Sequence, residues 1–113
     1  MLRIWHNPRC SKSRQTLALL EENGHSPEVF LYLDTPPDAK MLASVLKKLG
    51  IPAVDLARTG QAEWKEAGLT KDSTEDTIRA AMLSTPILIE RPIVETGDKA
   101  TIGRPPEAVL DIL

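Results

Sequence analysis

The only cysteine of the chain, Cys10, lies in a segment whose charge favours a reactive thiolate. Residues 1–20 contain no acidic residue and four basic ones, Arg3, Arg9, Lys12 and Arg14. The remaining residues hold ten basic and sixteen acidic side chains, so the first segment carries a charge of +4 and the rest −6. Neighbouring positive charge lowers the pKa of a thiol, and the thiolate is the nucleophilic form. We therefore expect Cys10 to be a nucleophile; the alternative is a buried cysteine that only fills space.

A hydroxyl group stands three positions after the thiol, in the sequence Cys10-Ser11-Lys12-Ser13. Ser13 occupies the place of the second cysteine in a C-x-x-C dithiol site, and serine cannot form a disulfide. Its hydroxyl could hydrogen-bond the Cys10 sulfur or a bound oxyanion; the alternative is an ordinary residue of a first helical turn. Because the chain has no second cysteine, any redox turnover at Cys10 requires a thiol from outside the chain.

Length and composition limit the classes of protein that are compatible with the sequence. The chain of 113 residues has the size of one domain, residues 1–113. Hydrophobic residues make up 42% and charged residues 27%, which is typical of a globular protein and not of a disordered one. A net charge of −2 and an aromatic content of 4% argue against nucleic acid as a partner. No apolar stretch approaches the roughly 18 residues of a membrane span, so we expect no membrane partner.

The cysteine count and the start of the sequence indicate a compartment. One cysteine excludes an internal disulfide, and the first residues lack the basic-then-apolar order of a signal peptide. We therefore expect a cytoplasmic protein, and we expect it to be a monomer. No spacing of His, Cys, Asp and Glu predicts a metal site, and no Gly-rich loop predicts a nucleotide site. The sequence thus predicts no tightly bound cofactor.

The elements around Cys10 predict a βαβ unit. Leu2–Trp5 is short and mostly apolar, as in a buried strand, and a helix should run from Ser11 to Asn23, where Gly24 can supply the left-handed cap. The segment 28–33 is apolar and β-prone, and we expect it to be a second central strand. A strand, a helix and a strand in this order imply a parallel pair. Cys10 would then lie at the N-terminus of the helix, where the helix dipole and unpaired N–H groups stabilise a thiolate.

The rest of the chain predicts helices followed by a hairpin. The pattern is helical over about residues 35–85, with starts near Asp38, Pro52 and Ser73. Residues 92–95 and 100–102 flank Gly97-Asp98, which is a β-hairpin signal. A last helix should follow Pro105-Pro106. The predicted fold class is α/β, a small mixed four-stranded sheet with flanking helices and an all-helical insertion between the second and third strands.

Three segments carry a specific resemblance to a known family. The loop from His6 to Arg14, with the sequence HNPRCSKSR, resembles the active-site loop of the glutaredoxin-linked arsenate reductase family, closest to the branch with a C-S-K-S loop. The segments 86–94 (PILIERPIV) and 103–107 (GRPPE) are similar to later motifs of the same family. The resemblance covers essentially the whole chain in order, and it implies a thioredoxin-like fold with a helical insertion.

The resemblance also implies roles for particular residues. Cys10 matches the nucleophile that attacks arsenate, and His6 matches a histidine that helps to activate the thiol. Arg58, Arg91 and Arg104 match three arginines that gather the oxyanion, for which a charged planar fork is suited. The Arg91-Pro92 bond is expected to be cis. The alternatives are a solvated helix residue for Arg58, surface ion pairs for Arg91 and Arg104, and simple packing for His6.

By the same resemblance, the chain reduces arsenate, or a similar small oxyanion, to arsenite. Glutathione, the co-substrate, attacks the Cys10 adduct, and glutaredoxin resolves the mixed disulfide. Lys12 departs from the best-known members, which carry a smaller uncharged residue there, and this leaves two further interpretations open. One is a general glutathione-dependent thiol-disulfide oxidoreductase. The other is a redox-sensing regulator that binds a transcription complex, against which the serine at position 13 argues, because that class uses C-x-x-C as its switch.

Overall fold

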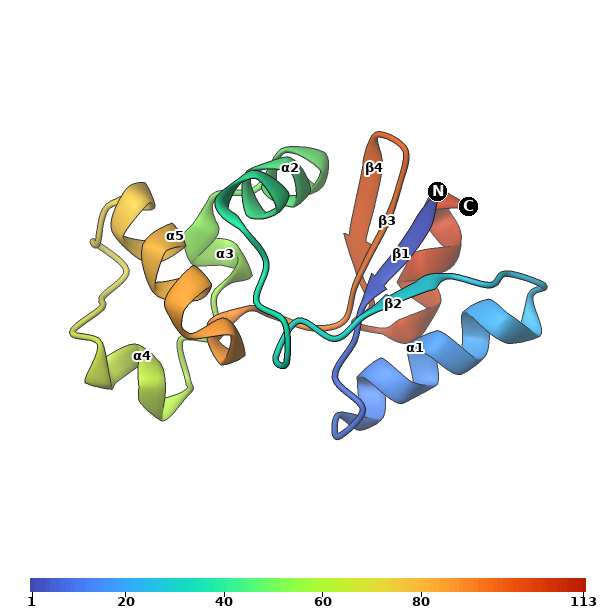
Figure 1. Ribbon diagram of the computed structural model, residues 1–113, viewed down its shortest axis with the longest axis horizontal. Coiled ribbons are helices and arrows are strands. Elements are labelled where there is room, and N and C mark those ends of the chain that lie inside the picture. The colour runs from blue at the N-terminus through green and yellow to red at the C-terminus, as the bar shows by residue number, and fades with distance from the viewer. The chain divides into compact units, whose positions relative to one another are not determined.

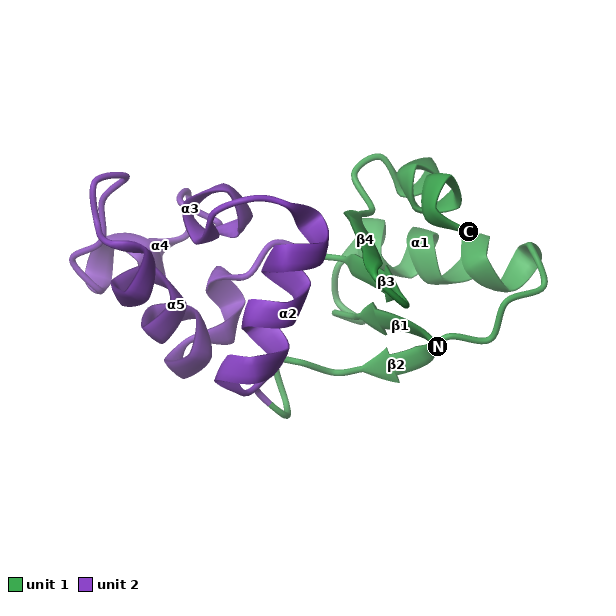
Figure 2. Cartoon of the chain, turned by 90° about the horizontal axis from the view of Figure 1, so that it is seen from above, with its two compact units in different colours: residues 1–35, 91–113 green, residues 36–90 purple.

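The computed structural model describes residues 1–113. In chain order its elements are β1 (Leu2–Trp5), α1 (Ser11–Glu22), β2 (Glu28–Phe30), α2 (Ala39–Leu49), α3 (Ala53–Leu56), α4 (Ala62–Glu66), α5 (Glu75–Ser84), the 3-10 helix η1 (Pro86–Leu88), β3 (Ile93–Thr96), β4 (Lys99–Ile102) and the 3-10 helix η2 (Pro106–Ile112). The chain divides into two compact units (Figure 2): a sheet unit of residues 1–35 and 91–113, and a helical unit of residues 36–90. The single domain over residues 1–113 stays a prediction.

The sheet unit is a mixed four-stranded sheet, as predicted (Figure 1). The strand order is β2-β1-β3-β4, with β1 and β2 parallel and the other two pairs antiparallel. The parallel pair confirms the βαβ unit. The β3–β4 hairpin turns through Gly97 and Asp98, and Gly97 has φ 50°, a left-handed conformation that glycine adopts without a steric penalty.

One face of the sheet carries the core of this unit. Side chains alternate between the two faces of a strand, so Leu2 and Ile4 of β1 lie on the same face. Helices α1 and η2 contact each other there, and their side chains meet the strands. The buried centre of this core consists of Ile4, Leu20, Val94 and Val109. Helix α1 is thereby held against β1, and its N-terminus lies at the end of the loop that follows Trp5.

The other face of the sheet carries a buried carboxylate, on β3, that the sequence did not reveal. Glu95 is only 3% exposed, although it lies in a strand predicted from its apolar neighbours. Its carboxylate accepts a hydrogen bond of 2.7 Å from the indole N–H of Trp5 and forms an ion pair of 3.6 Å with Arg3. A charged and hydrogen-bonded partner is what a buried carboxylate requires. Glu95 therefore ties β3 to β1 through side chains as well as through the backbone.

Two predicted elements differ from the structure. We predicted a central strand over residues 28–33, but β2 ends at Phe30 and lies at the edge of the sheet. The reason is long-range: β3 pairs with the other side of β1, which leaves β2 with one neighbour, and the chain then turns because the Leu31 carbonyl accepts from the N–H groups of Asp34 and Thr35. The last helix is a 3-10 helix; its first bond joins Ala108 N–H to the Pro105 carbonyl, three residues back.

The helical unit follows the predicted pattern of starts and stops. Asp38 caps α2 by accepting from Met41 N–H at 2.7 Å, and Gly50 ends it in the left-handed conformation. Thr74 caps α5 in the same way. Helix α5 packs against α2, α3 and η1, and its buried side chains are Ile78 and Met82. None of the helices in the structure has the length and apolar character needed to cross a bilayer.

Candidate active site

Cys10 is the N-cap residue of α1, which begins at Ser11 as predicted. Its backbone is extended, and its carbonyl accepts the first helical hydrogen bond, from Arg14 N–H at 3.0 Å. Its own N–H donates to the Asn7 carbonyl at 3.0 Å, which closes the loop before the helix. The residue is 9% exposed, so the sulfur lies at the surface of the core and not in open solvent. This position directs the first N–H groups of the helix toward the sulfur.

Several groups act on the pKa of Cys10. Burial is the largest single influence and raises the pKa. Against it, hydrogen bonds from the backbone N–H groups of Ser13 and Lys12 and the charges of Arg91 and Arg104 lower the pKa, and the net shift is downward. These influences stabilise the thiolate, as predicted from the helix terminus, but the charges come from Arg91 and Arg104 and not from the basic residues of segment 1–20. Cys10 therefore carries more negative charge near neutral pH than an ordinary cysteine does.

Two of the three predicted arginines lie at Cys10 in the sheet unit. The Arg104 guanidinium lies 3.7 Å from the Cys10 sulfur, measured from Nη2. Its Nε donates to the backbone carbonyl of Arg91 at 2.8 Å, so that one side chain joins the sulfur to the segment that carries the other arginine. Both Arg91-Pro92 and Arg104-Pro105 are cis. The first was expected from the resemblance, and the second was not.

The close approach at Gly103 holds these two segments together. Gly103 N–H donates to the Pro92 carbonyl at 2.9 Å. A Cβ atom at this position would lie 2.7 Å from Thr16 Oγ1 of α1 and 2.8 Å from Pro92 Cγ. Only glycine lets the loop before Arg104 approach both the helix and the Pro92 loop so closely. The sequence offered the motif Gly-Arg-Pro but no signal for this contact.

His6 and Ser13 form a buried pair beneath the Cys10 loop. His6 Nδ1 lies 2.7 Å from Ser13 Oγ, and Ser13 Oγ also accepts from Asn7 N–H at 3.0 Å. Burial lowers the pKa of His6, and the charge of Arg14 lowers it further, so the imidazole is neutral near pH 7. The His6 ring thus contacts the side chain of Ser13, and the backbone N–H of Ser13 hydrogen-bonds the Cys10 sulfur. The assigned roles of His6 in activation and of Ser13 in oxyanion binding stay predictions.

Comparison with known proteins assigns the chain to a family. The model of the ArsC family matches residues 5–112. The chain belongs to the ArsC family. An arsenate reductase of Haemophilus influenzae is 49% identical, over 97% of both chains. An uncharacterized protein of Escherichia coli strain K12, YfgD, is 53% identical, over 99% of this chain and 96% of its own. The solved structure of an arsenate reductase from Vibrio cholerae matches with a TM-score of 0.94 and 46% identity, over 99% of this chain and 97% of the other.

The ArsC-family assignment confirms the predicted fold class. The mixed sheet, its flanking helices and the helical segment between the second and third strands are those of a thioredoxin-like fold. The helical segment is longer than predicted, since the helical unit runs to residue 90 and includes η1. No group of three or more His, Cys, Asp and Glu side chains in the structure is arranged to hold a metal ion.

Arg58 of this ArsC-family chain belongs to the helical unit. An isolated antiparallel bridge joins Ala57 to Ile89, and Arg58 N–H donates to the Leu88 carbonyl at 2.7 Å. The guanidinium Nη1 lies 3.5 Å from the Ile87 carbonyl. The backbone of Arg58 is thus fixed within its own unit, and its predicted role in oxyanion binding stays a prediction.

Replacing Arg91 with glutamine should raise the pKa of Cys10, because it removes the larger of the two arginine charges that lower it. Arg104→Gln should raise it by less. The measurement is the rate of iodoacetamide alkylation between pH 5 and pH 10, whose midpoint reports the thiol pKa. Lys99→Gln, an exposed lysine on β4, is the matched control and should leave the midpoint in place. An unchanged midpoint in Arg91→Gln would contradict this account of the lowered pKa.

Replacing Ser13 with alanine should destabilise the protein by about 1–3 kcal/mol, because it leaves the buried His6 ring nitrogen and the half-buried Asn7 N–H without their partner. The free energy of unfolding from urea titration measures this. Ser11→Ala is the control, since Ser11 is an exposed residue of the same helical turn. Equal effects of the two substitutions would show that the buried hydroxyl contributes nothing specific.

Proposed function

We propose that this protein reduces arsenate to arsenite, with glutathione as the direct reductant and glutaredoxin as the thiol that resolves the mixed disulfide between Cys10 and glutathione. The observation that carries the proposal is the Cys10 sulfur at the N-terminus of α1, with its lowered pKa and the Arg104 guanidinium at 3.7 Å. A nucleophile beside a guanidinium is suited to an anionic substrate, whose charge the guanidinium offsets. The names of the relatives support arsenate as that substrate.

The first step is a substitution at arsenic without a change of oxidation state. Arsenate binds over the N-terminus of α1, with Arg91 and Arg104 on its oxygens and Arg58 as the third arginine. The Cys10 thiolate attacks arsenic, an S–As bond forms, and one oxygen takes up protons and leaves as water. Helix N-terminal N–H groups stabilise the negative charge of the bound oxyanion.

The second step transfers two electrons. A glutathione thiolate attacks the Cys10 sulfur, a disulfide forms, and the S–As bond breaks with its electron pair on arsenic, which leaves as arsenite. A glutaredoxin thiolate then attacks the glutathione sulfur and releases the Cys10 thiolate. One oxidised thiol pair accounts for the two electrons that arsenic gains. The outside thiols are required because Cys10 is the only cysteine.

A coupled assay tests the proposal. Purified protein, glutathione, glutathione reductase and glutaredoxin are mixed, and NADPH oxidation is followed with and without arsenate. We expect oxidation that depends on arsenate, on this protein and on glutathione, and that slows when glutaredoxin is omitted. Turnover of a glutathione mixed disulfide with no response to arsenate would instead support a general thiol-disulfide oxidoreductase. No turnover, with a stable polymerase complex, would support the regulator interpretation.

A further inference from the structure

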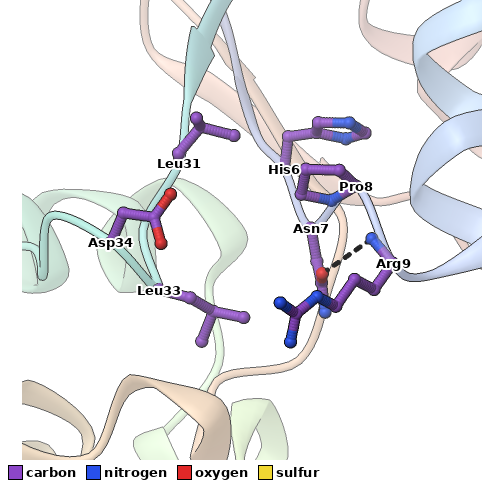
Figure 3. A pocket seen from close by; sticks show the side chains of 7 residues that line it. All are labelled: His6, Asn7, Pro8, Arg9, Leu31, Leu33 and Asp34. Carbon is purple, nitrogen blue, oxygen red and sulfur yellow. Dashed lines mark hydrogen bonds between the residues drawn. The ribbon is translucent and has the colours of Figure 1, made fainter.

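A cavity of about 260 Å³ lies next to the Cys10 loop, between residues 6–9 and residues 31–34 (Figure 3). One wall is the segment 6–9, and the other consists of Leu31, Leu33 and Asp34. We call it the β1–β2 cavity. Its lining does not include Cys10, Arg91 or Arg104. The β1–β2 cavity is therefore distinct from the oxyanion site, although the nucleophile, Cys10, directly follows the segment 6–9 in the chain.

The strand register fixes the place of this cavity. Trp5, the last residue of β1, pairs with Phe30 of β2 on one side and with Ile93 of β3 on the other. The loop that follows Trp5 is consequently flanked by residues 31–34 on one side and by Arg91-Pro92 on the other. The cavity lies at the carboxyl ends of the parallel strands β1 and β2, and in open α/β sheets this edge is where ligands bind.

Both walls are held by hydrogen bonds and packing. At the base, His6 N–H donates to the Phe30 carbonyl at 2.9 Å, so the walls begin to diverge directly after this bond. On the far wall, Tyr32 is buried and its ring centroid lies 6.3 Å from that of Trp5. Burial of Tyr32 leaves its two neighbours, Leu31 and Leu33, 38% and 37% exposed at the cavity. The cavity therefore exists before any ligand enters it, which lowers the entropic cost of binding.

The lining combines opposite charges with apolar surface. Arg9 and Asp34 are exposed and lie on opposite walls, and Figure 3 shows the Asp34 carboxylate and the Arg9 guanidinium beside the same space. Arg9 N–H donates to Asn7 Oδ1 at 3.0 Å, which fixes the backbone from which the guanidinium extends. A ligand with both an ammonium and a carboxylate group would complement these charges, while its apolar parts contact the leucines.

We propose that the β1–β2 cavity binds the peptide thiol that attacks the Cys10 adduct, with a carboxylate of glutathione on Arg9 and its α-ammonium group on Asp34. This rests on the proposed function, which requires such a thiol. Displacement at sulfur is in line, so the incoming thiolate must approach opposite the leaving arsenic. An oxyanion held on the β3 flank of the loop and a thiol held on the β2 flank meet that requirement. The bond that forms is S–S, and the S–As bond breaks with its electron pair on arsenic.

The test measures binding apart from the reaction. S-methylglutathione, which has the charges of glutathione but no thiol, is titrated into the wild-type protein, and amide shifts are followed by NMR. We expect the shifts to centre on residues 6–9 and 31–34. Arg9→Gln and Asp34→Asn should each weaken binding about fivefold, since each removes one exposed ion pair. Lys99→Gln and Asp98→Asn make the same charge changes on the distant hairpin and should leave affinity unchanged.

The outcomes separate this inference from the proposed function. Binding that weakens in both cavity variants but not in the controls supports it, even if arsenate turnover is absent and the proposed function fails. Unchanged affinity in Arg9→Gln and Asp34→Asn, or shifts centred on residues 91–104, overturns it while arsenate turnover can stand. In the coupled assay, the same variants should raise KM for glutathione and not for arsenate. A raised KM for glutaredoxin alone would assign the cavity to a protein thiol and overturn the inference.

Discussion

Replacing Cys10 with serine should abolish arsenate-dependent NADPH oxidation, with a fall of about a thousandfold or more. A serine hydroxyl has a pKa far above that of a thiol, so the groups that lower the pKa of Cys10 cannot produce a useful alkoxide near pH 7. Serine has no sulfur, so the S–As adduct that glutathione attacks cannot form. The measurement is the initial rate of the coupled assay at saturating arsenate and glutathione.

The fold should survive this substitution, and this makes the loss informative. Cys10 is an N-cap residue with no side-chain cap of its own, and serine is among the preferred residues at this position. The urea midpoint should therefore be equal to or above that of the wild type. Ser11→Ala, which changes the neighbouring exposed hydroxyl, should keep its activity. More than about a tenth of the wild-type rate in Cys10→Ser would refute the covalent mechanism.

Replacing Gly103 with alanine should cost about 1–3 kcal/mol of stability and most of the activity. The new methyl group would lie 2.7 Å from Thr16 Oγ1 and 2.8 Å from Pro92 Cγ, and neither contact is at the end of a long flexible chain. Thr16 is further fixed because its hydroxyl donates to the Lys12 carbonyl at 2.8 Å. Relief of the clash must move the loop that carries Arg104 or the loop that carries Arg91.

Gly60→Ala is the matched control for this substitution. No atom lies within 4 Å of a Cβ placed at Gly60, and its φ is not in the left-handed region. Alanine there should be neutral or stabilise by up to about 1 kcal/mol, because it restricts the unfolded chain. The urea midpoint and the arsenate KM are compared in both variants. If Gly103→Ala were as harmless as Gly60→Ala, the close packing at Gly103 would not be what holds the arginine segments.

The features that could be predicted from the sequence are those that local chemistry fixes. The start of α1 after Cys10, the turn at Gly97-Asp98 and the caps at Asp38 and Gly50 each depend on a few neighbouring residues. The backbone N–H groups of Lys12 and Ser13, which lower the pKa of Cys10, are local in the same sense, whereas the two charges that lower it come from the distant Arg91 and Arg104. The helix start, the turn and the caps are confirmed because no distant contact competes with them.

The features that could not be predicted depend on pairings between distant residues. The segment 28–33 looked central because it is apolar, but only the pairing of β3 with β1 decides that β2 lies at an edge. The burial of Glu95 is explained by Trp5, ninety positions away in the sequence. Likewise, the bond from Arg104 to the Arg91 carbonyl and the contact of Gly103 with Thr16 join segments that no local pattern relates.

The central position of β1 has a consequence for how the protein loses activity under stress. β1 has a neighbouring strand on each of its two edges, and the Cys10 loop follows it directly in the chain. Amides of a doubly paired strand exchange with solvent only when the sheet opens as a whole, whereas edge strands and helix ends fray separately. The strand that leads into the Cys10 loop therefore belongs to the slowest-exchanging part of the sheet unit. Local fraying at η2 would leave β1 paired on both edges, so the strand that leads into the Cys10 loop would lose its position only when the sheet itself unfolds.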